Sequence, residues 1–298
     1  MKRILKKIIN KYLTSSLNEF KNEFIKEVSE NTLGLSKVSQ ILLKLKYKEL
    51  LSKDVNLLPS FDDVGFRTYS QFEEDGILLY LFSILGTTNK KVVEVCAGNG
   101  IECNSTNLII NHGWNGFLFD GDAANVKIGK IFFDNHKNTF LWPPKFICSW
   151  ITAENINEII HDVGCSGEVD LLSLDIDGND YWVWKVLDCI KPRVVVCETH
   201  NVIPFDKALT IPYDPKFKMT IPDYHSASLL AMTKLAKEKG YRLVGTHRYG
   251  FNAFFVRNDV GAGIVPEVSV ESCLQDSYTK DAVEKRWPKV KDLNWVEV

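Results

Sequence analysis

The sequence predicts an α/β fold in which a mostly parallel sheet carries helices on both faces. Three observations predict it. Short apolar runs of strand length alternate with segments of helical length along most of the chain. The run at residues 92–95 leads into Cys96-Ala97-Gly98-Asn99-Gly100, and the next apolar run ends on Asp120. The last two runs, residues 241–245 and 253–256, stand so close together that they must pair antiparallel.

Composition bounds the class of protein. With 298 residues, of which 45% are apolar, the chain can bury a full core, and its net charge of -2 does not favour a nucleic-acid binder. The seven cysteines are scattered and include no Cys-x-x-Cys pair, so we expect neither a disulfide framework nor a zinc site, and we expect a cytoplasmic location. No apolar run has the length of a membrane span, and the pattern of a secretory signal is absent.

The first 60 residues are predicted to form a helical extension. Residues 1–13 carry basic side chains on one face and isoleucine and leucine on the other. This pattern occurs in helices that lie on a membrane surface, here the inner face, and more commonly in helices that pack on their own domain or on a second copy of the chain. Further helices are expected at residues 17–30 and 36–52.

The main domain is expected over residues 61–262. Its first helix begins near Ser70 and extends to residue 85. Later helices are predicted at residues 106–112, 122–133, 152–163, 182–190 and 226–239, and strands at 92–95, 117–119, 146–150, 169–176, 193–197, 241–245 and 253–256. Residues 263–298 are predicted to form a tail that packs on this domain, with a helix near residues 281–286.

The turn after the first strand predicts a nucleoside-binding site. Gly98 and Gly100 let backbone N–H groups approach a ligand because no Cβ stands in the way. Asp120, at the tip of the next strand, is placed to accept both hydroxyls of a ribose. A dinucleotide fingerprint would have a third glycine near position 103, where this chain has Cys103.

Four motifs in order resemble those of the FkbM-like methyltransferases. They are Ser70-Gln71-Phe72-Glu73-Glu74-Asp75, Glu94 through Gly100, Gly113 through Asp120, and Leu174-Asp175-Ile176-Asp177-Gly178. A parallel sheet finished by an antiparallel strand is also similar to the Rossmann-like class I methyltransferases rather than to NAD enzymes. The resemblance implies S-adenosylmethionine as the methyl donor and a hydroxyl group, often on a sugar, as the acceptor.

The resemblance also implies donor contacts. Glu94 through Gly100 would meet the methionine part, Asp120 the ribose, and Trp150 with Ile151 the adenine. The full set that we expect at the donor is Ser70, Gln71, Glu94, Ala97, Gly98, Asn99, Gly100, Asp120, Gly121, Asp122, Trp150, Ile151 and Asp175. The chain departs from the family pattern at Cys96, where a glycine is usual, and at Asp120 and Asp177, where glutamate is common.

Methyl transfer to a hydroxyl also requires removal of a proton, by a general base or with a metal. We expect His200 to be the base, because the ordinary histidine pKa of about 6.5 suits this task. Further catalytic candidates are Asp175 and Asp177, at the carboxyl end of the strand predicted at residues 169–176, and Glu198, at the end of the strand predicted at residues 193–197. The alternative for His200 is a hydrogen bond to a loop backbone, and the alternative for Asp175 is a helix cap.

Magnesium and the acceptor define two further sets of residues. Asp175, Asp177, Asp180 and Asn201 offer the hard oxygen ligands that Mg²⁺ prefers, although such clusters also occur solvated. Residues 202–224 are rich in proline and aromatic residues and are expected to overhang the acceptor, or to form only a structural lid. Acceptor contacts are expected from Asn179, Asp180, Asn201, Tyr224 and His225.

The sequence therefore predicts an S-adenosylmethionine-dependent O-methyltransferase. Its expected acceptor contains carbohydrate, as a surface polysaccharide, a glycolipid or a nucleotide sugar. Two other classes stay open: a nicotinamide-dependent sugar oxidoreductase, and a non-catalytic scaffold that retains the fold.

Overall fold

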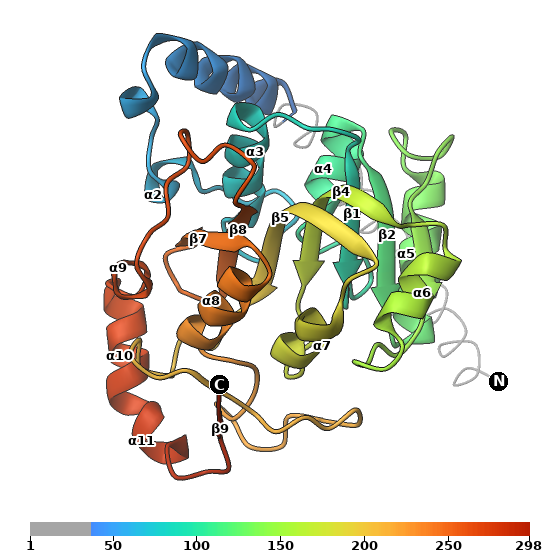
Figure 1. The fold of residues 1–298 in the computed structure, drawn as a ribbon. Helices are drawn as coiled ribbons and strands as arrows, with labels where there is room; N and C mark the ends of the chain where they lie inside the picture. Colours follow the sequence, from blue (N-terminus) through green and yellow to red (C-terminus); the bar gives the residue numbers. More distant parts are fainter. Residues whose placement is uncertain (1–36) are drawn as a thin grey trace, which may run out of the picture. The chain divides into compact units, whose positions relative to one another are not determined.

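A computed structural model describes residues 37–298 of the chain (Figure 1). The helices predicted at residues 1–13 and 17–30, and with them the predicted membrane contact, lie outside the described residues. The chain divides into two compact units, Met1–Lys46 and Tyr47–Val298. The described part of the first unit is helical and belongs to a helix over residues 37–53, close to the 36–52 predicted. The predicted domain boundary after residue 60 stays a prediction.

A seven-stranded sheet organises the second unit, in the order β3-β2-β1-β4-β5-β8-β7. Strands β1 to β5 pair parallel, whereas β8 pairs antiparallel with both β5 and β7. The strands are β1 (Lys91–Val95), β2 (Asn115–Asp120), β3 (Lys145–Cys148), β4 (Gly167–Leu174), β5 (Ile190–Glu198), β7 (Tyr241–Thr246) and β8 (Asn252–Arg257). The predicted fold class, a mostly parallel sheet with an antiparallel strand near its end, is confirmed.

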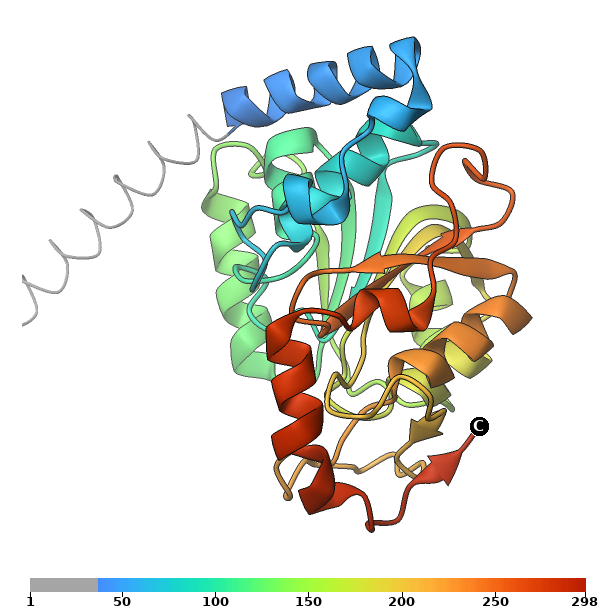
Figure 2. The same cartoon turned by 90° about the vertical axis from the view of Figure 1, so that its left-hand side faces the viewer.

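Helices cover both faces of this sheet. Figure 2 shows α3, α4 and α5 on one side and α6, α7 and α8 on the other. Because helices cover both faces, the central strands are rich in apolar residues, as Val93, Leu172 and Val195 illustrate with no exposed surface. The helices are α2 (Phe61–Val64), α3 (Glu74–Ile84), α4 (Thr106–His112), α5 (Ala123–Asn135), α6 (Ile156–Asp162), α7 (Asp180–Val186) and α8 (Leu229–Glu238). None of the helices described between residues 37 and 298 is both long and apolar enough to cross a membrane.

An ion pair fastens the amino ends of the strands. The Asp170 carboxylate on β4 accepts hydrogen bonds from the guanidinium of Arg193 on β5, at 2.8 Å, and from the backbone N–H groups of Thr88, Asn89 and Lys90. Arg193 donates in turn to the carbonyls at the end of α3. Both side chains are almost fully buried, and each has further hydrogen-bond partners in the backbone. The pair therefore fixes the connection between α3 and β1 at the amino ends of the strands.

The carboxyl-terminal tail packs beside the segment that follows β5. The short strand β6 (Leu209–Thr210) pairs antiparallel with β9 (Val296–Glu297), which two-residue strands do not reveal in sequence. The tail also forms α9 (Val270–Cys273), α10 (Ser277–Lys285) and α11 (Trp287–Val290), and the helix predicted at residues 281–286 falls mainly in α10. Ala282 and Val290 of the tail form a small apolar cluster with Val202.

Candidate active site

The strand register brings four side chains into one row at the carboxyl edge of the sheet. Val95 on β1 pairs with Phe119 on β2 and with Leu174 on β4, and Leu174 pairs with Cys197 on β5. The next residue of each strand therefore lies in the same row: Cys96, Asp120, Asp175 and Glu198. Open parallel sheets bind ligands at this edge, where the strand order reverses, and here it reverses between β1 and β4.

The turn after β1 has an unusual backbone. Cys96, Gly98 and Gly100 all adopt left-handed conformations, with φ of 61°, 56° and 69°. At Gly100 a Cβ would lie 2.9 Å from the rings of Phe133 and Phe146, so a larger residue does not fit. A Cβ at Gly98 would meet no atom within 4 Å, which shows open space beside that residue. A ligand can therefore approach the backbone closely at Gly98.

Asp120 is held rigidly at the tip of β2. Its Oδ2 accepts the N–H of Gly98 at 2.8 Å, and its Oδ1 accepts the N–H of Asp122 at 2.8 Å and the amide of Asn125 at 3.3 Å. Asp122, also expected at the donor, is the N-cap of α5. A carboxylate has about four acceptor positions, so Asp120 retains capacity for a hydroxyl of a ligand.

Trp150 stands beside the same strand tip. Its indole N–H donates to the carbonyl of Pro215 at 2.9 Å, yet half of the residue remains exposed. The ring lies 2.8 Å from the position that a Cβ on Gly121 would take, so the glycine permits this close approach. Ile151, the other residue expected near the adenine, is buried.

Several other expected donor residues are bonded within the chain. Glu94 accepts the N–H groups of Asn104 and Ser105 at 2.8 and 2.9 Å and so fixes the approach to α4. The buried Ser70 hydroxyl accepts the N–H of Asp75 at 3.1 Å. Of the remaining expected residues, Ala97 is buried, Asn99 accepts the N–H of Ile101, and Gln71 is exposed.

Three carboxylates converge after β4 and β5. Oxygen atoms of Asp175, Asp177 and Glu198 all lie within 4.8 Å of one another. Burial and the charge of Asp180 raise the pKa of Asp175 well above its ordinary value, and burial with the charge of Asp175 does the same for Glu198. The set offers the hard oxygen ligands of a divalent cation.

The other two predicted metal ligands are placed differently. Asp180 is fully buried and accepts the N–H groups of Ile176 and Gly178 at 2.8 and 3.2 Å, so it shapes the turn that carries Asp177. Burial raises the pKa of Asp180 to about 6. Asn201 donates to the carbonyl of Tyr249 at 2.7 Å. The geometry thus favours Glu198 over Asp180 and Asn201 as the third oxygen ligand.

His200, the expected base, is buried. Its Nε2 lies 2.8 Å from the carbonyl oxygen of Asp223, and only 2% of the residue is exposed. Burial, with a smaller effect of His225, lowers the pKa of His200 to about 3. This is the backbone hydrogen bond that the sequence left open as an alternative, and it favours a structural role for His200.

His225, which was expected to contact the acceptor, is linked to Glu198 through a serine hydroxyl. Its Nδ1 lies 2.9 Å from Oγ of Ser226, and that hydroxyl donates to Oε2 of Glu198 at 2.5 Å. Because the hydroxyl proton is directed to Glu198, Oγ accepts the proton of Nδ1, and Nε2 keeps its lone pair. Burial lowers the pKa of His225, whereas the charge of Asp177 raises it. The spacing of the sequence gives no sign of this contact, because Ser226 and Glu198 are far apart along the chain.

Backbone strain concentrates at the same edge. Among the described residues, five other than glycine have a positive φ, and four of them are Cys96, Asp177, Asp223 and Ser226. Each such residue costs on the order of 1 kcal/mol and persists only where its surroundings hold it in place. Strain of this kind is typical of functional sites.

The segment after β5, predicted at residues 202–224 to overhang the acceptor or to form a structural lid, packs against the ends of β3 and β4, and its contact with an acceptor stays a prediction. The Asn179 amide donates to the carbonyl of Asp214 at 2.8 Å, and the Phe217 ring lies 2.5 Å from the position of a Cβ on Gly178. Together with the bond from Trp150 to Pro215, these contacts carry the segment from the end of β3 to the end of β4.

Tyr224 faces the tail. Its hydroxyl donates to the carbonyl of Asn294 at 2.7 Å, and its ring packs edge-on against Trp295. The hydroxyl is thus engaged away from the carboxylates, which leaves the acceptor contact predicted for Tyr224 without support from a nearby site residue.

Comparison of this chain with known proteins finds solved structures of low similarity. No protein-family model matches this chain, and no curated protein matches its sequence. One similar solved structure is magnesium protoporphyrin IX methyltransferase (ChlM) from Synechocystis PCC 6803 with bound SAM, at 12% identity over 62% of this chain and 77% of that chain, with a TM-score of 0.38. A second is the N-terminal domain of EvdMO1 with SAH bound, at 12% identity over 72% of this chain and 93% of that chain, with a TM-score of 0.43. These likenesses are too weak to assign an activity to this chain.

Proposed function

We propose that this protein is an S-adenosylmethionine-dependent O-methyltransferase. One observation carries the proposal: Asp120, Asp175 and Glu198 stand in register around the left-handed turn after β1, at the edge where the strand order reverses. A fixed carboxylate beside a glycine turn suits a ribose, and further carboxylates within the same row suit the chemistry of an acceptor.

The proposed donor site uses groups that are already in place. Asp120 accepts a ribose hydroxyl, the space beside Gly98 admits the ligand next to the backbone, and the exposed Trp150 ring lies on the adenine side. When bound, S-adenosylmethionine supplies an electrophilic methyl group on a sulfonium. The task left to the chain is to place the acceptor oxygen in line behind that methyl group, which supplies much of the rate.

His225 is the proposed general base. Its Nε2 takes the proton of the acceptor hydroxyl, while Nδ1–H remains bonded to Ser226 and through it to Glu198. A carboxylate at the end of such a chain stabilises the imidazolium and holds the ring in one tautomer. The positive charge gained by His225 also favours the ionised form of Glu198, whose pKa is raised by burial and by the charge of Asp175.

A Mg²⁺ ion is the proposed second component of the site. Asp175, Asp177 and Glu198 would hold it, since their oxygen atoms are close enough to share one ion. An ion held there would supply Lewis-acid chemistry to the acceptor oxygen. Burial and, to a smaller extent, neighbouring carboxylates raise the pKa values of Asp175 and Glu198, and a bound cation would offset both effects.

The proposed acceptor contains carbohydrate. Carboxylates accept hydrogen bonds from the neutral hydroxyls that sugars present. The overhanging segment adds the Phe217 ring next to Gly178 and the half-exposed Phe205, and aromatic faces suit sugar rings. Asn179 holds this segment over the row through Asp214. A polysaccharide, a glycolipid or a nucleotide sugar would each present such hydroxyls.

A transfer assay tests the proposal. The protein is incubated with methyl-labelled S-adenosylmethionine and with oligosaccharides, glycolipids and nucleotide sugars, with and without Mg²⁺, and label on a sugar oxygen is sought by mass spectrometry. Transfer that is lost in Asp175→Asn supports the proposal, with Asp134→Asn on α5 as the control. Donor binding without transfer to any acceptor favours the scaffold, and NAD-dependent oxidation of a sugar favours the oxidoreductase.

A further inference from the structure

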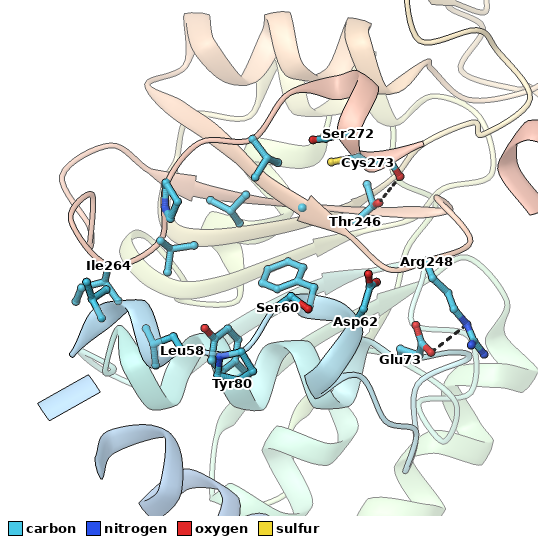
Figure 3. Close-up of a pocket in the computed structure, with 18 of the residues that line it drawn as sticks. Leu58, Ser60, Asp62, Glu73, Tyr80, Thr246, Arg248, Ile264, Ser272 and Cys273 are labelled. Atoms are coloured by element: carbon cyan, nitrogen blue, oxygen red, sulfur yellow. Dashed lines mark hydrogen bonds and ion pairs between the residues drawn. The ribbon is translucent and has the colours of Figure 1, made fainter. Parts of the chain in front are cut away.

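A large cavity lies apart from the row of carboxylates (Figure 3). Its volume is about 990 Å³, at the upper end of the range of small-molecule sites. It is bounded by residues 55–62, which include the 3-10 helix η1 (Val55–Leu57), by β7, and by residues 262–276. None of its lining residues belongs to the candidate active site, so the proposed function does not use it.

One part of the cavity wall is apolar. Leu58, Phe61, Tyr80 and Ile264 contribute to it. The wall depends on Gly245 of β7, where a Cβ would lie 2.6 Å from the Phe61 ring, and where the register of β7 with β8 is shifted. The bare backbone therefore admits Phe61, whose ring adds to an apolar wall on which an apolar chain can be buried.

The polar part of the wall is acidic. Three carboxylates, of Asp62, Glu73 and Asp276, line the cavity together with one guanidinium, of Arg248. That guanidinium is already engaged, because its Nε lies 3.2 Å from Oε1 of Glu73 and its Nη2 donates to the Tyr249 hydroxyl at 2.7 Å (Figure 3). The unbalanced charge therefore favours a cation and disfavours a phosphate or a carboxylate.

The cavity does not suit a peptide that would bind as an additional β-strand. Strand β7 is the last strand of the sheet, but its free edge is partly covered: the Val268 N–H donates to the Leu243 carbonyl at 3.0 Å. The Thr246 hydroxyl also donates, to the Cys273 carbonyl at 3.2 Å. A peptide could not pair along β7 without breaking these bonds, which leaves a small molecule as the fitting occupant.

We propose that this cavity binds a cationic amphiphile, that is, an ammonium group on an apolar chain. The chain contacts Leu58, Phe61 and Ile264, and the ammonium group lies beside Asp62, which Figure 3 shows on the side of Glu73 and Arg248, away from Leu58 and Ile264. Asp62 is well suited to bind the ammonium group, because the capping box of α2 uses the neighbouring Asp63 and not Asp62.

Calorimetric titration with three probes of equal chain length tests the proposal: n-octylammonium, octanoate and octyl glucoside, each below its micelle concentration. We expect n-octylammonium to bind at least about tenfold more tightly than either of the others. Equal or tighter binding of octanoate overturns the proposal, because the acidic wall would then select nothing. Preferred binding of octyl glucoside also overturns it, in favour of a neutral polyol site.

Two variants locate the binding. Asp62→Asn removes a wall charge and should weaken n-octylammonium binding about fivefold or more, whereas Asp134→Asn on α5 should not change it. Ile264→Trp fills the apolar end and should abolish binding, whereas Ile128→Trp, at an exposed position of α5, should leave it intact. Unchanged binding in both cavity variants overturns the proposal. Binding of S-adenosylhomocysteine should be the same in all four variants, so the result does not depend on the proposed function.

Discussion

The backbone N–H of Gly98 donates a hydrogen bond of 2.8 Å to Oδ2 of Asp120, and this contact joins the turn after β1 to the tip of β2. The other carboxylate oxygen is held by the N–H of Asp122. Asp120 is therefore in position before any ligand arrives, and a preformed acceptor lowers the cost of ordering on binding. The same contact requires the left-handed backbone of Gly98, so the turn and the carboxylate form one unit.

The strain at Cys96 predicts a stabilising substitution. A residue with a Cβ at φ 61° costs about 1 kcal/mol relative to a relaxed conformation. We expect Cys96→Gly to raise the free energy of unfolding by up to about 1 kcal/mol, measured by urea denaturation. Cys96→Ala is the control, because it removes the sulfur and keeps the Cβ. A gain in the alanine variant as large as in the glycine variant would assign the effect to the thiol instead.

Substitutions of the two histidines are expected to lower turnover by different amounts. His225→Asn should lower methyl transfer about 100-fold and leave the affinity for S-adenosylhomocysteine unchanged, because only proton removal is lost. His200→Asn should lower it less than about tenfold, since its Nε2 is committed to the Asp223 carbonyl. Initial rates at saturating donor separate the two. The assignment of the base to His225 fails if the larger loss belongs to His200→Asn.

The pKa of His200 predicts a pH dependence of stability. The ordinary histidine pKa is about 6.5, and burial lowers that of folded His200 to about 3. Between these values the unfolded chain binds a proton that the folded chain does not, so the free energy of unfolding falls as pH falls. His200→Asn should flatten this slope between pH 6.5 and pH 4.5, about the range that urea denaturation can cover. His161→Asn, at an exposed side chain, should leave the slope unchanged.

The ion pair beneath the sheet predicts a large loss of stability. Burial alone would raise the pKa of Asp170, but hydrogen bonds from Arg193 and the backbone outweigh it and lower the pKa. The ionised Asp170 therefore stabilises the fold fully at pH values above the ordinary aspartate pKa of about 3.9. This stabilisation is lost as the pH falls through the lower pKa that Asp170 has in the folded protein. At neutral pH, Asp170→Asn should cost about 3 kcal/mol of unfolding free energy, because it leaves Arg193 buried and unpaired. A loss below about 1 kcal/mol, similar to that of the exposed Asp162→Asn, would contradict the importance of this pair.

Local patterns predict much of this fold. The apolar run at residues 92–95, the glycine turn after it and the acid at position 120 each depend on neighbouring residues, and the structure places them as expected. Asp175 and Glu198 could also be predicted to meet, because the carboxyl ends of adjacent parallel strands share one edge. The antiparallel pairing of β7 and β8 followed from the short connection between them.

Contacts between distant segments could not be predicted in the same way. The burial of His200 depends on the carbonyl of Asp223 and on the nearby ring of His225. Both residues lie more than 20 positions later in the sequence, at the end of the segment that follows β5. The bond from Ser226 to Glu198 requires a left-handed serine, which no sequence pattern indicates. The pairing of β6 with β9 joins two-residue strands that show no periodicity.

The proposed function depends first on the binding of S-adenosylmethionine by Asp120 and the turn after β1. Calorimetric titration with S-adenosylhomocysteine tests it most directly, with NADH titrated in parallel and with Asp120→Ala and Asp134→Ala as matched variants. We predict binding at roughly micromolar concentrations that is lost in Asp120→Ala, retained in Asp134→Ala and absent for NADH. Binding of NADH in place of S-adenosylhomocysteine, or equal affinity in the Asp120→Ala variant, would contradict the claim.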